Sequence, residues 1–240
     1  MRKTFSIIIT LVITLAVVGG SVWLYKLFNP NDTTQEPPTG NMQINTEYWK
    51  NISWASYGDS ITQQGGWQDE VVNMLGIKRQ VNLGVGATLI SNSGSRPMCS
   101  AERLQQIKNA DPELLTIFGG INDSGSNVAI GKYNGDLATF KGGYSYIIEY
   151  LQEWKPTMDI VLIVPHNCYA MVNNFSVYQN AVRQIANHYE LPYIDLAVDG
   201  GINDENYTEY LVDGVHLTES GKTLIGRIIA EKINEIKGNN

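Results

Sequence analysis

The sequence predicts an α/β protein, with helices packed around a mostly parallel sheet. Three observations lead to this expectation. From residue 52 onward, short apolar segments alternate with longer segments whose apolar residues have helical spacing. The run at 160–164, Ile-Val-Leu-Ile-Val, is typical of a parallel strand buried on both faces. The chain has 240 residues, of which 43% are hydrophobic, so it can bury one sizeable core.

Five short segments are expected to form the strands. They are residues 52–57, 80–83, 114–118, 160–164 and 192–196. The first three are each followed by glycine, which lets the backbone turn sharply away from a strand. The last is short and begins with a proline. Because the carboxyl ends of parallel strands lie at one edge of a sheet, catalytic or binding side chains that follow several strands would meet there.

Five segments between and after the strands are expected to be helical. They are residues 67–75, 101–109, 144–154, 177–189 and 220–236. The first has apolar residues at helical spacing and a stop signal at Gly76, and the second is closed by Asp111-Pro112. The last is amphipathic and would cover one face of the sheet.

The N-terminal region is expected to be separate from this domain. Arg2 and Lys3 precede an uncharged apolar stretch, Phe5 to Tyr25, which as a helix would span about 31 Å, enough for a bilayer core. Positive charge before it predicts a cytoplasmic N-terminus and an exported body. We expect residues 1–28 to anchor the protein in the cell membrane; a cleaved signal peptide is the alternative. Residues 29–45 are a polar, proline-rich linker, and 46–240 the folded domain.

Charge and cysteine content exclude several classes of function. The formal net charge is −7, and no cluster of Lys and Arg lies in the body, so nucleic acid is not an expected partner. Cys99 and Cys168, the two cysteines, lack metal-ligand spacing, and we expect neither a metal nor a cofactor. They could form a disulfide after export or remain two buried thiols.

Four short motifs carry groups suited to acyl transfer. They are Gly58-Asp59-Ser60, Asn82-Leu83-Gly84-Val85-Gly86, Gly120-Ile121-Asn122-Asp123 and Asp213-Gly214-Val215-His216. A serine hydroxyl needs an adjacent base, and His216, three residues after Asp213, is the best candidate. His188 falls late in an expected helix, and His166 has no acidic partner at short spacing. Ser60 as a helix N-cap is the structural alternative to a nucleophile.

The second and third motifs offer hydrogen-bond donors for a developing oxyanion. Asn122 has a side-chain N–H, although it could equally form an Asx-turn. The glycines at 84 and 86 allow a backbone amide to face a ligand. Asp123 is expected to be structural and to accept hydrogen bonds from nearby backbone amides.

In their order and content, these motifs resemble those of the SGNH hydrolase superfamily, the GDSL-type esterases and lipases. The resemblance covers about residues 52–236 and implies a three-layer, flavodoxin-like sandwich with a five-stranded parallel sheet. It also implies that Ser60, Asp213 and His216 form a catalytic triad. Ser60, Gly86 and Asn122 would form the oxyanion hole. The family's second block usually reads Asn-x-Gly-x-x-Gly, so Ala87 is the alternative to Gly86 as amide donor.

The substrate is expected to be a small ester or an acylated glycan. Residues 124–143 are polar and glycine-rich, without a long amphipathic segment to shelter a fatty acyl chain. We therefore expect hydrolysis of short-chain esters, above all O-acetyl groups on carbohydrate. A lipase or lysophospholipase, or an inactive glycan-binding module of the same fold, is the alternative. Trp67 and His166 are candidate substrate contacts, with a structural role as their alternative.

Overall fold

A computed structural model of the protein describes residues 44–133, 135–170 and 174–237. The chain divides into two units, Met1–Met42 and Gln43–Asn240, and the second contains every described helix and strand. The expected anchor at 1–28 and nearly all of the linker at 29–45 lie outside the described residues. Within the ranges that are described, no helix is long and apolar enough to cross a membrane.

Five parallel strands form one sheet in the order β2-β1-β3-β4-β5. They are β1 (Ser53–Gly58), β2 (Arg79–Gly84), β3 (Leu114–Phe118), β4 (Asp159–Val164) and β5 (Tyr193–Asp195). The order is that of flavodoxin-like folds, in which ligands bind at the carboxyl edge near the point where the strand order reverses, between β1 and β3. All residues of β1 and β3 are buried, as central strands covered on both faces require. The predicted α/β sandwich with a five-stranded parallel sheet is confirmed.

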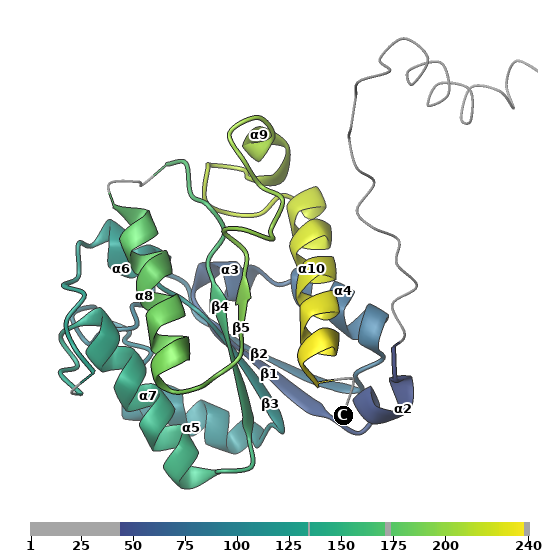
Figure 1. Ribbon diagram of the computed structural model, residues 1–240, viewed down its shortest axis with the longest axis horizontal. Coiled ribbons are helices and arrows are strands. Elements are labelled where there is room, and N and C mark those ends of the chain that lie inside the picture. The colour runs from purple at the N-terminus through teal and green to yellow at the C-terminus, as the bar shows by residue number, and fades with distance from the viewer. Residues whose placement is uncertain (1–43, 134, 171–173, 238–240) are drawn as a thin grey trace, which may run out of the picture. The chain divides into compact units, whose positions relative to one another are not determined.

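Helices cover the sheet on both faces and complete a three-layer sandwich (Figure 1). One face carries α4 (Trp67–Leu75) and α10 (Glu219–Lys237); the other carries α5 (Ala101–Ala110), α7 (Phe140–Trp154) and α8 (Phe175–His188). The short helices are α2 (Thr46–Trp49), α3 (Ser60–Gln64), α6 (Ile121–Gly125) and α9 (Tyr207–Tyr210). Two of them, α3 and α6, begin just beyond the carboxyl ends of β1 and β3 and start with residues of the motifs described above.

The helix α7 begins four residues before the expected start at Tyr144. Gly142 and Gly143 look like helix breakers in the sequence, yet both lie in its first turn. A Cβ atom at Gly142 would lie 2.0 Å from the carbonyl oxygen of Asp136, and one at Gly143 would lie 2.7 Å from that of Ile90. These glycines therefore permit close backbone packing rather than ending the helix.

An aromatic cluster fills the core between the sheet and α4. The ring of Trp67 lies 5.7 Å from that of Trp54 in β1 and 6.2 Å from that of Phe118 in β3. The indole N–H of Trp54 donates to the hydroxyl of Thr116 at 3.1 Å, so this buried polar group is satisfied. The cluster fixes α4 against the central strands.

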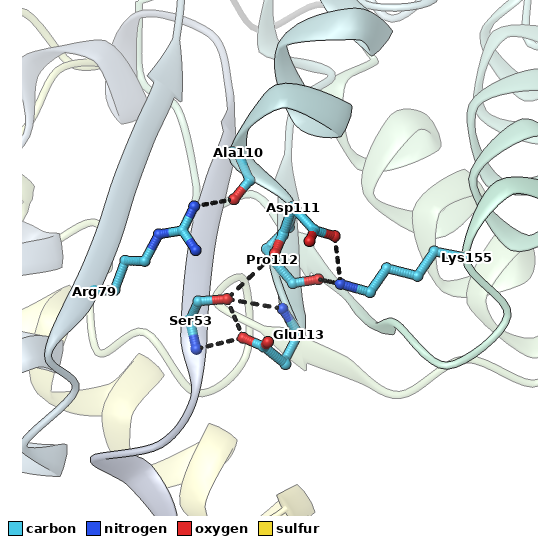
Figure 2. A network of polar contacts seen from close by, with 7 residues as sticks. All are labelled: Ser53, Arg79, Ala110, Asp111, Pro112, Glu113 and Lys155. Carbon is cyan, nitrogen blue, oxygen red and sulfur yellow. Dashed lines mark hydrogen bonds and ion pairs between the residues drawn. The ribbon is translucent and has the colours of Figure 1, made fainter.

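Polar contacts fasten the amino-terminal edge of the sheet, opposite the edge that carries the motifs (Figure 2). The backbone N–H of Ser53, at the start of β1, donates to the carboxylate of Glu113 at 2.7 Å. Lys155, after α7, binds the carboxylate of Asp111 at 2.7 Å, and Arg79 of β2 donates to the last carbonyl of α5. These contacts join β1, β2 and the start of β3 to the ends of two helices.

Candidate active site

The turn between β1 and α3 presents the hydroxyl of Ser60. Asp59 caps α3, because its Oδ1 accepts a hydrogen bond from the N–H of Ile61 at 3.0 Å. Ser60 is the first residue of the helix, so the alternative in which Ser60 is the N-cap is not what the structure contains. Its backbone N–H has no acceptor within the described part of the chain. Because Asp59 caps the helix, the side chain of Ser60 is free to take a partner from another element.

That partner is His216, in the loop before α10. The Oγ of Ser60 lies 2.9 Å from Nε2 of His216, and Nδ1 of the same ring lies 2.7 Å from Oδ2 of Asp213. The three side chains are therefore linked in series, from hydroxyl to imidazole to carboxylate. With Nδ1 protonated and bound to the carboxylate, Nε2 carries the lone pair that can accept the hydroxyl proton.

The carboxylate of Asp213 is held in one orientation by backbone amides. Its Oδ1 accepts the N–H of His216 at 2.8 Å and that of Val215 at 3.0 Å, which leaves Oδ2 for the imidazole. Partial burial alone would raise the pKa of Asp213, but these amides and the imidazole outweigh it and lower the pKa to about 2. Asp213 is therefore ionised at neutral pH, as a group that stabilises an imidazolium must be.

The third motif brings the side-chain amide of Asn122 to the same edge. Gly120, with φ of +121°, turns the chain off β3 so that α6 starts immediately, and Asn122 is its second residue. One N–H of Asn122 donates to the carbonyl of Thr88 at 2.9 Å. This bond fixes the amide plane and leaves the second N–H for another acceptor.

The second motif places Gly86 beside the nucleophile but with its amide in use. A Cβ atom at Gly86 would lie 3.8 Å from Cβ of Ser60. The N–H of Gly86 donates to Oε1 of Gln63 at 2.8 Å. At Ala87, the alternative donor, φ is +59°, and its N–H has no acceptor in the described ranges. Both candidate amides are thus present, one of them capped by a side chain.

Two buried carboxyl groups lie beneath the motifs. Asp123 accepts hydrogen bonds from the amides of Ile90 and Ser91, at 2.8 and 3.1 Å, as expected for a structural carboxylate. Burial raises the pKa of Asp123 to about 6 and that of Asp59 to about 7. Their role is to hold the loops around the site.

The predicted substrate contacts of Trp67 and His166 are wrong in this structure. Both side chains have an exposed fraction of 0%. Trp67 belongs to the aromatic core, and its N–H donates to the carbonyl of Ile61 at 3.3 Å. His166 lies 2.9 Å from the carbonyl of Val215 and supports the turn that carries His216. Burial lowers the pKa of His166 to about 4, so it stays neutral at physiological pH.

The cysteines are two unpaired buried thiols. Cys99 and Cys168 are both free, and burial raises their pKa values to about 11 and 12. Such thiols are poor nucleophiles because little thiolate is present at neutral pH. Among the described residues, no group of three or more His, Cys, Asp and Glu side chains could hold a metal ion.

Comparison with known proteins identifies the family. A sequence profile described as the GDSL-like Lipase/Acylhydrolase family matches residues 56–224, well over half of the chain and all four motifs. The chain belongs to this family. It is therefore a serine hydrolase that acts on esters. The structure of a Lactobacillus plantarum protein is similar over 79% of this chain and 97% of its own, at 26% identity and a TM-score of 0.67.

A second solved structure shares the fold at lower identity. It is that of the acetyl xylan esterase AlAXEase, 22% identical, covering 74% of this chain and 98% of its own, with a TM-score of 0.56. No curated protein matches the sequence.

Gln63 is the residue at this GDSL-type site that the sequence did not reveal. It is an exposed glutamine on a short helix, a residue type common on solvent-facing surfaces. The usable signal was its spacing, three residues after Ser60, which places both side chains on one face of α3.

Proposed function

We propose that Ser60 is the nucleophile, His216 the general base and Asp213 the residue that orients it. The hydrogen-bonded series of these three side chains carries the proposal. Ser60 Oγ attacks the ester carbonyl carbon while its proton passes to Nε2 of His216. The imidazolium then protonates the departing alcohol. Water, deprotonated by the same imidazole, releases the acyl group and restores the serine.

The negative charge on the carbonyl oxygen would be stabilised by three N–H donors. These are the amide of Ser60, the side chain of Asn122, and an amide of the turn after β2, from Gly86 or Ala87. Donors fixed in advance need little rearrangement during the reaction, and losing one costs about 10²–10³-fold in rate.

We further propose that the acyl group is short and that the alcohol is a carbohydrate. A cavity of about 450 Å³ lies where the loop after β4 meets the start of α8, and its lining is mostly polar, including Asn167, Ser176, Gln179 and Asp204. Such a lining suits hydroxyl groups better than a fatty acyl chain. The similarity to an acetyl xylan esterase supports the same choice.

The cavity lies next to the turn that carries the base. Tyr169, another lining residue, donates its backbone N–H to the carbonyl of Gly214 at 2.7 Å, and Gly214 lies between Asp213 and His216. The ring centroids of Tyr169 and Tyr207 lie 4.2 Å apart and the rings stack, so the two side chains support each other at this wall. A glycan whose acetylated oxygen faces Ser60 could extend in this direction.

Two measurements test the substrate proposal. Rates on p-nitrophenyl esters should fall steeply from acetate to octanoate; the reverse order would support a lipase or lysophospholipase. Asp204→Asn should lower kcat/KM on an acetylated xylo-oligosaccharide about tenfold, because a charged hydrogen-bond acceptor is replaced by a neutral one, and leave p-nitrophenyl acetate unchanged. Glu205→Gln is the matched control. Equal losses of Asp204→Asn on both substrates, or none, would contradict the glycan site.

We also propose that residues 1–28 anchor the enzyme in the cell membrane with its domain outside. The apolar run from Phe5 to Tyr25, preceded by two positive charges, supports this. Fractionation of cells expressing the full chain should place the intact protein in carbonate-washed membranes. A shortened protein in the medium would instead indicate a cleaved signal peptide.

A further inference from the structure

We infer that Gln63 caps the oxyanion site in the free enzyme and that its side chain must leave before a substrate reacts. The inference rests on the proposed roles of Ser60 and Gly86. Its basis is one contact: Oε1 of Gln63 accepts the N–H of Gly86 at 2.8 Å. A carbonyl oxygen in that position is a chemical stand-in for the oxyanion itself.

The backbone on both sides of this contact, in α3 and in the turn after β2, is held in place by the fold. The side-chain amide of Asn82 donates to the carbonyl of Thr62 in α3 at 2.7 Å, and the N–H of Val85 donates to the carbonyl of Gly58 at 3.0 Å. A Cβ atom at Gly84 would lie only 2.2 Å from the backbone nitrogen of Gln63. The turn after β2 is therefore packed directly on α3, and this packing holds Gly86 beside Ser60.

The side chain of Gln63, by contrast, can move. It is exposed, and its one hydrogen bond in the described part of the chain is the bond to Gly86. Rotation of this side chain toward solvent costs that bond and disturbs no buried packing. The oxygen of the ester carbonyl then takes the position that the Gln63 oxygen has left and accepts the N–H of Gly86.

The cap opposes both catalysis and tight binding of any tetrahedral adduct. Its removal should raise kcat/KM about two- to tenfold, the range expected for one net hydrogen bond. A boronic acid, whose adduct with Ser60 places an oxygen in the same hole, should bind more tightly by a similar factor. A merely structural role for Gln63 would not make these two quantities rise together.

The test compares three variants with wild-type enzyme. Gln63→Met keeps the length of the side chain and removes the strong acceptor. Gln64→Ala alters the neighbouring exposed glutamine, for which the structure records no side-chain hydrogen bond in the described residues. Ser60→Ala tests the proposed function separately. We expect Gln63→Met to raise kcat/KM on p-nitrophenyl acetate and to lower the boronate Ki by a similar factor, whereas Gln64→Ala matches wild type.

Other results would overturn the cap. Unchanged kcat/KM and Ki in Gln63→Met would mean that the amide of Gly86 is not used and that Ala87 supplies the second donor. A loss of activity would mean that Gln63 assists the reaction, and equal gains in Gln63→Met and Gln64→Ala would remove the link to Gly86. If Ser60→Ala retained full turnover, the proposed nucleophile would be wrong whatever the result at position 63.

Discussion

Replacing Asp213 by Asn should nearly abolish catalysis while leaving the fold intact. Oδ1 of Asp213 accepts two backbone amides, those of Val215 and His216, and an asparagine oxygen would take over both bonds. The new NH₂ group would then face Nδ1 of His216 and donate to it. The imidazole would be forced into the tautomer with its proton on Nε2, where it cannot accept the proton of Ser60.

The size of the effect follows from that tautomer. The equivalent change in a serine protease, which also leaves the geometry intact, lowers kcat about 10⁴-fold, and this corresponds to about 5.5 kcal/mol of activation free energy. Stability should change little, because the Asp213 side chain is 53% exposed and its backbone contacts are retained. Thermal unfolding of the variant should therefore resemble that of wild type.

The assay is hydrolysis of p-nitrophenyl acetate at neutral pH, with thermal unfolding measured on the same samples. Asp69→Asn, an exposed substitution in the first turn of α4, is the matched control and should be fully active. A folded Asp213→Asn variant that keeps kcat within tenfold of wild type would refute the assigned tautomer and with it the role of Asp213.

Two further predictions concern stability. Burial raises the pKa of Asp59 from its ordinary value of 3.8 to about 7. Between about pH 4 and pH 7 the folded state therefore binds a proton that the unfolded chain has released, so the contribution of Asp59 makes the free energy of unfolding fall as the pH rises. Asp59→Asn keeps an oxygen that can cap α3 and removes this titration. The urea midpoint of the variant minus that of wild type should therefore increase from pH 4 to pH 7, and a difference that does not change with pH would contradict the raised pKa of Asp59. Gly84→Ala would place a methyl group against the backbone of Gln63 and should cost about 1–3 kcal/mol of unfolding free energy, and an unchanged urea midpoint would contradict that packing.

Helices and strands could be predicted from sequence where the pattern of apolar residues matches the pattern of buried residues in the structure. The strand at 114–118 and the helix at 67–75 have the predicted bounds, because one is an unbroken apolar run and the other has a clear period and a glycine stop. The start of α7 was misplaced because Gly142 and Gly143 serve tertiary packing, which no local pattern encodes. The order of the strands likewise depends on long-range pairing and was available only through the family resemblance.

The site could be predicted in part, for a related reason. Ser60 and Asn122 lie in motifs directly after a strand, and Asp213 and His216 lie together in the loop before the last helix. The structure brings all four to one edge of the sheet. Trp67 was misread because an aromatic residue near that edge has the same sequence signal whether it faces the ligand or the core. The state of the Gly86 amide depends on the rotamer of Gln63, and a rotamer cannot be read from sequence.

The most direct test of the account is the position of covalent labelling by a fluorophosphonate probe, located by peptide mass spectrometry. We predict one probe per molecule on the hydroxyl of Ser60, because His216 lies 2.9 Å from that oxygen and can take its proton. Labelling at another residue, or none on folded wild-type protein, would contradict the account.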